Sequence, residues 1–284
     1  MRQQQRRPWV AGAALFVATS LTGCGADFDD SGSGGEPVER VVSIRSSAGP
    51  LWLGAPPVIS PIGDDVLAGV SDGVVAVRAL GCGPTSNGTA FAVAPGLLVG
   101  AAHVVTGASS VEVGSLGDDV NNPSPDHAAT VVGFDPDRDL ALLRSDMRVT
   151  ALPMSRARIG AEGVVLGYPA GKELTASPAR VEHFVRATGL WGTDNVRNVY
   201  VLAADVRTGQ SGAPLLDSDG NVIGIAFAQL RGSAEVAFAL SRGELLNFLV
   251  ESGVDARIDY LGRTVINARR DDLSATPNGE CGGG

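Results

Sequence analysis

This sequence of 284 residues has few aromatic residues, only three histidines and no cluster of basic residues after its N-terminus. A net charge of −9 without a basic cluster excludes the surface that binds nucleic acid, and the acidity mainly favours solubility. Neither His127 nor His183 has a nearby cysteine or histidine with which to hold a metal ion. We therefore expect no metal, no cofactor and no nucleic acid partner.

The apolar run at the N-terminus, from Trp9 to Leu21, is too short to span a membrane comfortably. It follows three arginines and precedes small residues, so residues 1–23 are predicted to form a secretory signal peptide. The ending Leu-Thr-Gly-Cys at Cys24 resembles the lipobox of bacterial lipoproteins. That resemblance implies lipidation of Cys24, as by palmitate, and an extracytoplasmic protein anchored to the cell membrane. An ordinary cleaved signal peptide is the alternative.

The sequence contains three cysteines, and assigning Cys24 to a lipid leaves Cys82 and Cys281 as a pair. In an oxidising compartment we expect these two to form a disulfide. The bond would close a loop of about 200 residues and could add about 4–5 kcal/mol of stability on the chain-entropy model. Two free thiols are the alternative.

Glycine, in contrast, is abundant, with 38 residues that punctuate short runs of Val, Ala, Ile and Leu. This pattern is typical of an all-β sandwich or barrel. Strands are expected in two sets, at 73–80, 89–93, 97–100, 110–113, 128–134 and 140–144, then at 163–167, 179–187, 198–206, 213–216, 222–227 and 236–240. One helix is expected at 241–253, with Ser241 and Glu244 as a capping box and Gly253 as its stop.

These elements place a compact domain at residues 67–253, with a first half at about 67–150 and a second at about 151–253. Residues 24–66 are acidic or rich in Gly, Ser and Pro and are expected to form a flexible tether and an extension. Residues 254–284 are expected to be a tail that carries Cys281.

The turn at residues 208–214 lies between two of the apolar runs and contains Gly209, Ser211 and Gly212. A serine in such a turn exposes its hydroxyl, and the N–H groups of Gly209 and Ser211 can converge on one point. That is the geometry of an oxyanion hole, in which charge develops on a carbonyl oxygen. A surface turn of no chemical role is the alternative.

Two upstream residues can complete a catalytic set with Ser211. His103 follows an apolar run in Ala-Ala-His-Val-Val, and Asp139 precedes the alternating run Leu-Ala-Leu-Leu. A nucleophilic serine needs a base to take its proton and a carboxylate to orient that base. The order His, Asp, Ser is that of the chymotrypsin type, whereas α/β-hydrolase esterases have the order Ser, Asp, His.

These three segments resemble the trypsin-like (chymotrypsin-fold) serine peptidases. The resemblance implies an all-β fold of two six-stranded antiparallel Greek-key barrels with a C-terminal helix. It assigns His103 as general base, Asp139 as its orienting acid and Ser211 as nucleophile, in the cleft between the barrels. The stretches 164–171, 175–180 and 204–206 and the pair Cys82 and Cys281 also resemble the MarP-type extracytoplasmic proteases of actinobacteria. This resemblance covers residues 74–281 and implies a stress-related role at the cell envelope.

Several positions near Ser211 bear on activation and specificity. Gln210 replaces an aspartate of the digestive trypsins, and Ala213 replaces a glycine, which requires that its φ is not positive. Asp205 is six residues before Ser211, where trypsins carry the acid that selects Lys or Arg; a structural aspartate is the alternative. By their place after a strand, Phe227, Ala228 and Gln229 are expected to line the cleft.

The sequence thus predicts a serine endopeptidase acting on a protein or peptide substrate at the outer face of the bacterial envelope, bound to the membrane through Cys24. A catalytically silent barrel that serves as an envelope scaffold or binding protein is the alternative. An inactive descendant usually lacks a member of the triad, and none is missing here.

Overall fold

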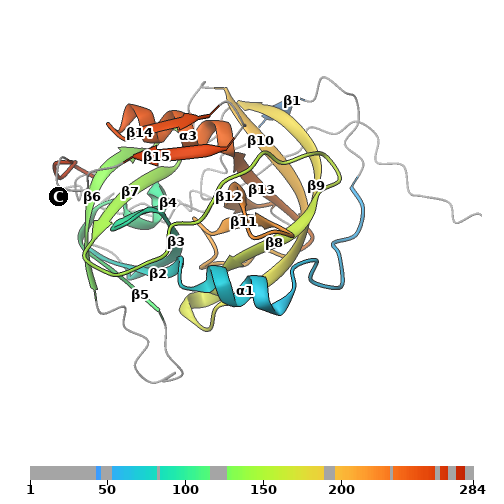
Figure 1. The fold of residues 1–284 in the computed structure, drawn as a ribbon, viewed down its shortest axis with the longest axis horizontal. Coiled ribbons are helices and arrows are strands. Elements are labelled where there is room, and N and C mark those ends of the chain that lie inside the picture. Colours follow the sequence, from blue (N-terminus) through green and yellow to red (C-terminus); the bar gives the residue numbers. More distant parts are fainter. Residues whose placement is uncertain are drawn as a thin grey trace, which may run out of the picture.

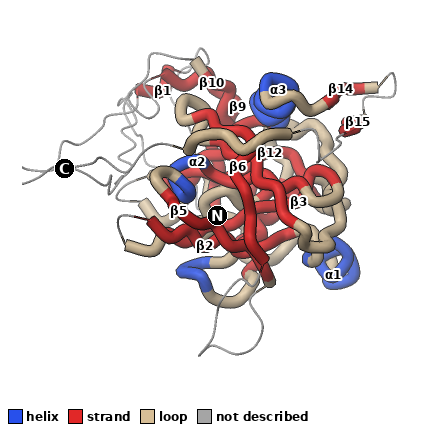
Figure 2. Tube along the Cα trace, turned by 90° about the vertical axis from the view of Figure 1, so that its left-hand side faces the viewer, coloured by secondary structure: helices blue, strands red, loops and turns tan. Residues whose placement is uncertain are grey.

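The computed structural model describes residues 43–45, 53–81, 84–115, 127–188, 196–230, 233–259, 263–267 and 273–278. Cys24, Cys82 and Cys281 lie outside these residues, so the lipidation and the disulfide remain predictions. The described chain forms two antiparallel barrels side by side, the first at the left of Figure 1 and the second at the right. Seen from the side, strands fill the molecule, and the helices α1 (Asp64–Ser71) and α3 (Arg242–Glu251) lie outside them (Figure 2).

The first barrel is closed by six antiparallel strands in the order β2-β3-β4-β7-β6-β5. Alternate side chains of these strands fill its interior, which contains mainly Val, Ala and Leu. The strands are β2 (Val74–Gly81), β3 (Ser86–Ala94), β4 (Leu97–Ala101), β5 (Ala108–Gly114), β6 (His127–Asp135) and β7 (Leu140–Ser145).

The second barrel contains six strands in the order β9-β10-β13-β12-β11-β8, and pairing of β8 with β9 closes it. The strands are β8 (Glu162–Gly167), β9 (Thr175–Thr188), β10 (Arg197–Ala204), β11 (Pro214–Asp217), β12 (Val222–Gln229) and β13 (Val236–Ser241). A short strand, β1 (Ser43–Arg45), adds to the edge of β9 from the segment expected to be an extension. The predicted all-β, two-barrel fold is confirmed.

Helix α3 (Arg242–Glu251) is the helix expected from the sequence. Ser241 accepts a hydrogen bond from the Glu244 amide, and Gly253, with φ of +85°, ends the helix. The reciprocal half of the predicted capping box is absent, because the Glu244 carboxylate accepts from Asn198 and Arg138 instead. Tertiary partners therefore outcompete the local cap.

A helix before the first barrel and a hairpin after α3 are among the elements that were not expected from the sequence. Helix α1 (Asp64–Ser71) begins inside the predicted tether, and the hairpin of β14 (Asp255–Ile258) and β15 (Thr264–Asn267) lies in the predicted tail. Helix α1 precedes the first barrel in sequence but packs on the second, where Gly220 lies against Val66 and Val70. The described residues contain no helix long and apolar enough to cross a membrane.

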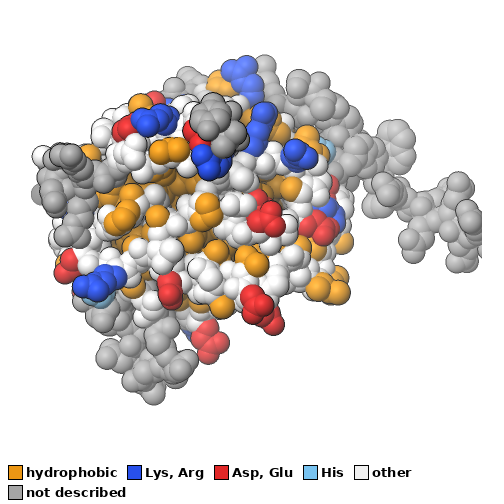
Figure 3. Space-filling model, in the orientation of Figure 1, with side chains coloured by type: hydrophobic (Ala, Val, Ile, Leu, Met, Phe, Trp, Pro, Cys, Tyr) orange, Lys and Arg blue, Asp and Glu red, His pale blue; other side chains and the backbone are white. Residues whose placement is uncertain are grey.

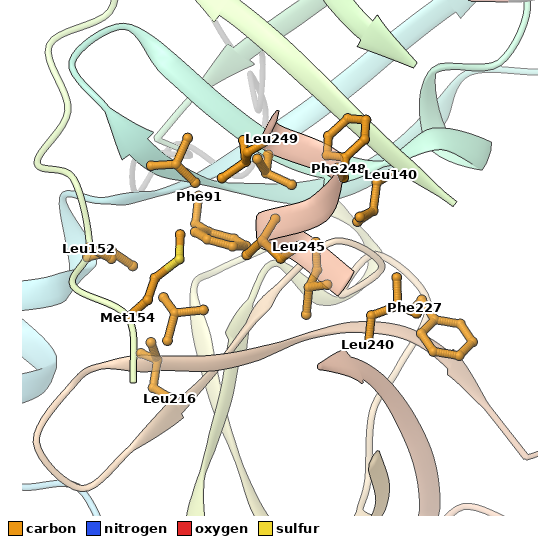
Figure 4. Close-up of a cluster of buried hydrophobic side chains, with 14 of the residues drawn as sticks. Phe91, Leu140, Leu152, Met154, Leu216, Phe227, Leu240, Leu245, Phe248 and Leu249 are labelled. Atoms are coloured by element: carbon orange, nitrogen blue, oxygen red, sulfur yellow. The ribbon is translucent and has the colours of Figure 1, made fainter. Parts of the chain in front are cut away.

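A single apolar cluster joins the barrels to each other and to α3 (Figure 4). Phe91 and Leu140 come from the first barrel, Leu216 and Leu240 from the second, and Phe248 from α3. Because this core is shared, the two barrels are held in a fixed relation at the junction between them. On the face shown in Figure 3, most basic side chains lie toward the top and most acidic ones lie below them, with apolar side chains in between.

Candidate active site

His103 and Asp139 are brought together by adjacent strands of the first barrel. Strand β4 ends at Ala101, which pairs with Leu140 of β7, and His103 follows in the short helix α2 (Ala102–Val105). Asp139 adopts a left-handed backbone conformation with φ of +58°, which aspartate tolerates better than most residues. One carboxylate oxygen accepts from the His103 amide at 2.7 Å, and the other lies 2.6 Å from Nδ1 of the ring.

The electrostatics of this pair suit a general base. Asp139 is only 1% exposed, whereas the His103 side chain is 24% exposed. Burial alone would lower the pKa of His103, but the charge and the hydrogen bond of Asp139 outweigh it, so that the pKa is raised. Because both carboxylate oxygens are engaged by His103, the ring is fixed with Nδ1 toward Asp139. Nε2 is then the nitrogen left to take a proton from a nucleophile.

Ser211 lies in two successive tight turns. The Gln210 amide donates to the Arg207 carbonyl at 2.9 Å, and the Ala213 amide donates to the Gln210 carbonyl at 3.0 Å. The third residue of each turn is glycine, with φ of +96° at Gly209 and +86° at Gly212. Such turns require a positive φ at this position, which explains the spacing of the two glycines around Ser211.

The four carbonyls from Thr208 to Ser211 each accept a hydrogen bond. The Thr208 carbonyl accepts from the Ala170 amide, and the Gln210 carbonyl accepts from the Ala213 amide. Thr89 donates to the other two, with its hydroxyl to Gly209 and its amide to Ser211. The amides within these turns differ. Those of Gln210 and Gly212 donate to carbonyls, whereas those of Gly209 and Ser211 donate to no other residue in the described part of the chain. Two such amides beside the half-buried Ser211 are what an oxyanion hole needs.

The Ser211 turn is fastened to the barrel that carries His103. The Thr89 amide of β3 donates to the Ser211 carbonyl at 2.9 Å. Gly212 packs so closely that a Cβ there would lie 2.7 Å from the Ala101 nitrogen, two residues before His103. Among the described residues, no hydrogen bond joins the Ser211 hydroxyl to the His103 ring, as is common in unliganded sites.

Comparisons with known proteins agree with this geometry. The trypsin-like peptidase domain matches residues 88–225. Serine protease Rv3671c of Mycobacterium tuberculosis (strain ATCC 25618 / H37Rv) is 36% identical over 214 residues, 69% of this chain and 51% of that protein. The crystal structure of the active form of the Rv3671c protease is similar with a TM-score of 0.66 and 30% identity, over 88% of this chain and 99% of that one. This chain belongs to the trypsin-like serine peptidases.

The mitochondrial serine protease HTRA2 of Bos taurus is a further relative, 31% identical over 217 residues that cover 69% of this chain and 45% of that protein. The chain therefore spans about half the length of the curated relatives it matches. The crystal structure of the inactive form of the Rv3671c protease is also similar, with a TM-score of 0.60 and 34% identity over 70% of this chain and 98% of that one.

The structure explains the two positions at which this chain differs from the digestive trypsins, Gln210 and Ala213. Gln210 is fully buried, and its side chain accepts from the Arg207 amide at 2.9 Å and donates to the Ser177 hydroxyl at 3.2 Å. It thus anchors the turn within the second barrel. Ala213 meets the expectation that its φ is not positive. Among the described non-glycine residues, a positive φ occurs only at Asp139 and Ala170. Its methyl group fills space left by Gly167.

Two of the four residues expected to contact substrate, Asp205 and Phe227, lie in positions that do not favour such a contact. Asp205 is 45% exposed on its side chain and pairs with Arg207 at 2.8 Å, which disfavours a role as the buried acid that selects Lys or Arg. The ring of Phe227 is buried against Phe238 and so belongs to the core (Figure 4). Ala228 and Gln229 are half-buried just after Ala226, whose carbonyl accepts from the Gly212 amide. Substrate contacts by Ala228 and Gln229 remain predictions.

Thr89 was not predicted from the sequence to take part in the site. It is 1% exposed, and its amide and hydroxyl bond the carbonyls of Ser211 and Gly209. Its position at the start of an apolar run gave no signal of this role, because the contacts are with residues more than a hundred positions away. Only the pairing of the two barrels reveals them.

Proposed function

We propose that this chain is a serine endopeptidase whose nucleophile is Ser211, with His103 as general base and Asp139 as the residue that orients it. The amides of Gly209 and Ser211 form the oxyanion hole, and no metal or cofactor takes part. The observation that carries the proposal is the buried Asp139 carboxylate, which engages both the amide and the ring of His103 on a barrel to which the Ser211 turn is fastened.

The reaction follows from this arrangement. The Ser211 oxygen attacks the carbonyl carbon of a peptide bond while its proton passes to Nε2 of His103. The carbonyl oxygen becomes an anion, stabilised by the two amides. The carbon–nitrogen bond then breaks, and His103 gives the proton to the departing amine. Water, deprotonated by His103, hydrolyses the resulting ester and releases Ser211.

A fluorophosphonate probe tests this function without a known substrate, because it reacts with an activated serine by displacement of fluoride. We expect the purified full-length chain to be labelled, and Ser211→Ala and His103→Ala to lose about 10⁴-fold or more in labelling rate. Ser109→Ala, which removes an exposed hydroxyl, is the matched control and should label as the wild type does. A folded wild-type protein that does not label would contradict the proposal and favour a silent scaffold.

We also propose that the peptidase acts at the outer face of the cell envelope, held there by a lipid on Cys24. The basic start, short apolar run and lipobox of residues 1–24 support this location. Wild-type cells should incorporate labelled palmitate into the protein, whereas Cys24→Ala should not. Labelling of both proteins or of neither would contradict the anchor.

A further inference from the structure

The amide of Gly209 can serve as an oxyanion donor only if its direction is fixed before the substrate arrives. Glycine itself does not supply that fixation, because it adopts positive and negative φ about equally well. Gly209 has φ of +96°, so the direction of its amide depends on what holds the peptide planes on its two sides. Both planes are held from outside the turn.

The plane before Gly209 contains its own amide and the Thr208 carbonyl. That carbonyl accepts a hydrogen bond of 2.6 Å from the amide of Ala170, in the short 3₁₀ turn η1 (Pro169–Gly171). A Cβ on Gly209 would lie 2.5 Å from the same Ala170 nitrogen, so the two segments are in close contact. A trans peptide directs its C=O and N–H to opposite sides. Holding the carbonyl toward Ala170 therefore directs the Gly209 amide away from it.

The plane after Gly209 contains its carbonyl, which accepts a hydrogen bond of 2.8 Å from the Thr89 hydroxyl. The same hydroxyl accepts one of 3.0 Å from the amide of Tyr168, two residues before Ala170. Thr89 thus holds one plane directly and places the segment that holds the other. It does so from β3 of the first barrel, across the junction from the second.

We propose that Thr89 is a positioning residue that sets the oxyanion hole, by holding Gly209 and the Tyr168–Ala170 main chain through one buried hydroxyl. This inference rests on the proposed function. It adds that the reaction rate depends on contact between the two barrels. Thr89 lies on the first barrel, and the residues to which its hydroxyl and amide bond, Gly209, Tyr168 and Ser211, lie on the second.

The test compares Thr89→Val, which removes the hydroxyl but keeps the shape, with Thr89→Ser, which keeps the hydroxyl. Ser145→Ala is the matched control, since the Ser145 hydroxyl also bonds one carbonyl and one amide, those of Ala128 and Met147, in the first barrel away from the turn. For each variant of the full chain, the rate constant of fluorophosphonate labelling is measured across pH, and the folded fraction is measured by circular dichroism.

Removal of a complete oxyanion donor slows enzymes by about 10²–10³-fold, and misdirecting one donor should slow labelling by about 10-fold or more. We expect that loss in Thr89→Val per folded molecule, with Thr89→Ser close to wild type and Ser145→Ala unchanged. The pH midpoint should stay at its wild-type value in Thr89→Val, because the His103–Asp139 pair is intact.

The proposal is overturned if Thr89→Val labels at the wild-type rate, if Thr89→Ser is as slow as Thr89→Val, or if Ser145→Ala slows equally. Should Thr89→Val fail to fold, Thr89→Ala removes the hydroxyl without adding bulk, and its rate relative to Thr89→Ser decides in the same way. A folded wild type that fails to label would overturn the proposed function and this inference together, whereas labelling of wild type with no loss in Thr89→Val overturns this inference alone.

Discussion

At the scale of single residues, His103 is balanced between two opposing influences. Burial favours its neutral form, and the charge and hydrogen bond of Asp139 favour the protonated form and prevail. Its pKa therefore lies above the ordinary value of 6.5. The stabilisation that protonated His103 gives the fold is complete below the unfolded pKa of about 6.5 and is lost as the pH rises through the raised folded pKa.

The same shift predicts the pH dependence of reaction. Only neutral His103 can accept the Ser211 proton, so labelling should increase with pH around a midpoint above 6.5. In Asp139→Asn the influences that raise the pKa are removed, and burial alone should bring it below that value. The rate should also fall by about 10⁴-fold, since the ring loses its orienting carboxylate.

NMR titration of the His103 ring in the two proteins measures this shift directly. Asp146→Asn is the matched control, because Asp146 pairs with another histidine, His127, at 3.1 Å on the surface. It should leave the His103 titration where it was. A His103 pKa that stays unchanged or rises in Asp139→Asn would contradict the assignment of Asp139 as the residue that raises it.

At the scale of elements, the turn that carries Asp139 is tied to helix α3 through Arg138. The Arg138 side chain, 13% exposed, donates to Glu244 at 3.4 Å and to Glu251 at 2.6 and 3.0 Å, and it also pairs with Asp135. Glu244 is buried and Glu251 is exposed, so most of the stabilisation should come from Glu244. The helix that follows the second barrel thereby supports the first.

Arg138→Met should lower the free energy of unfolding by about 2–3 kcal/mol, because among the described residues it leaves the buried Glu244 carboxylate with Asn198 alone as partner. Urea unfolding of the purified protein measures the change. Arg257→Met is the control, since Arg257 pairs with Asp255 at the surface and its loss should cost less than about 0.5 kcal/mol. Equal losses in the two variants would show that the link to α3 does not stabilise the protein.

All twelve barrel strands were predictable from the sequence, because short apolar runs between glycine and proline turns are a local signal. The same holds for α3. The contiguous motifs of His103, Asp139 and Ser211 also gave a local signal, and the roles of these residues remain proposals. Helix α1 was missed because its first cap position is Gly63, which has no side chain to signal a helix start. The partners of Glu244 and Thr89 were not predictable, since they depend on how distant strands meet.

At the scale of the whole molecule, the candidate site lies where the two barrels meet, and segments before and after the barrels reinforce that contact. Helix α1, before the first barrel, packs on the second. Residues 273–278, after the second barrel, return to the first, where Thr276 donates to Val131 at 2.8 Å and Asn278 donates to Val105 at 2.7 Å. Val105 is the last residue of α2, so the tail reaches the helix that carries His103.

This return of the tail supports the predicted bond between Cys82 and Cys281. Gly81, next to Cys82, pairs with Ala108 in the first barrel. Asn278, three residues before Cys281, donates to the Ala108 carbonyl at 3.1 Å, and its own carbonyl accepts from Gly107. The described neighbours of both cysteines thus contact the same turn. Such a bond would hold the tail against α2 and confine the unfolded chain.

Peptide mapping under non-reducing conditions should therefore recover Cys82 and Cys281 in one linked peptide. Reduction should lower the free energy of unfolding by up to about 4–5 kcal/mol, because the closed loop holds about 200 residues. Cys82→Ser should match the reduced wild type, and adding reductant to that variant should change nothing further. If both cysteines instead react with a thiol reagent in the folded, untreated protein, the tail is held by its hydrogen bonds to the first barrel alone.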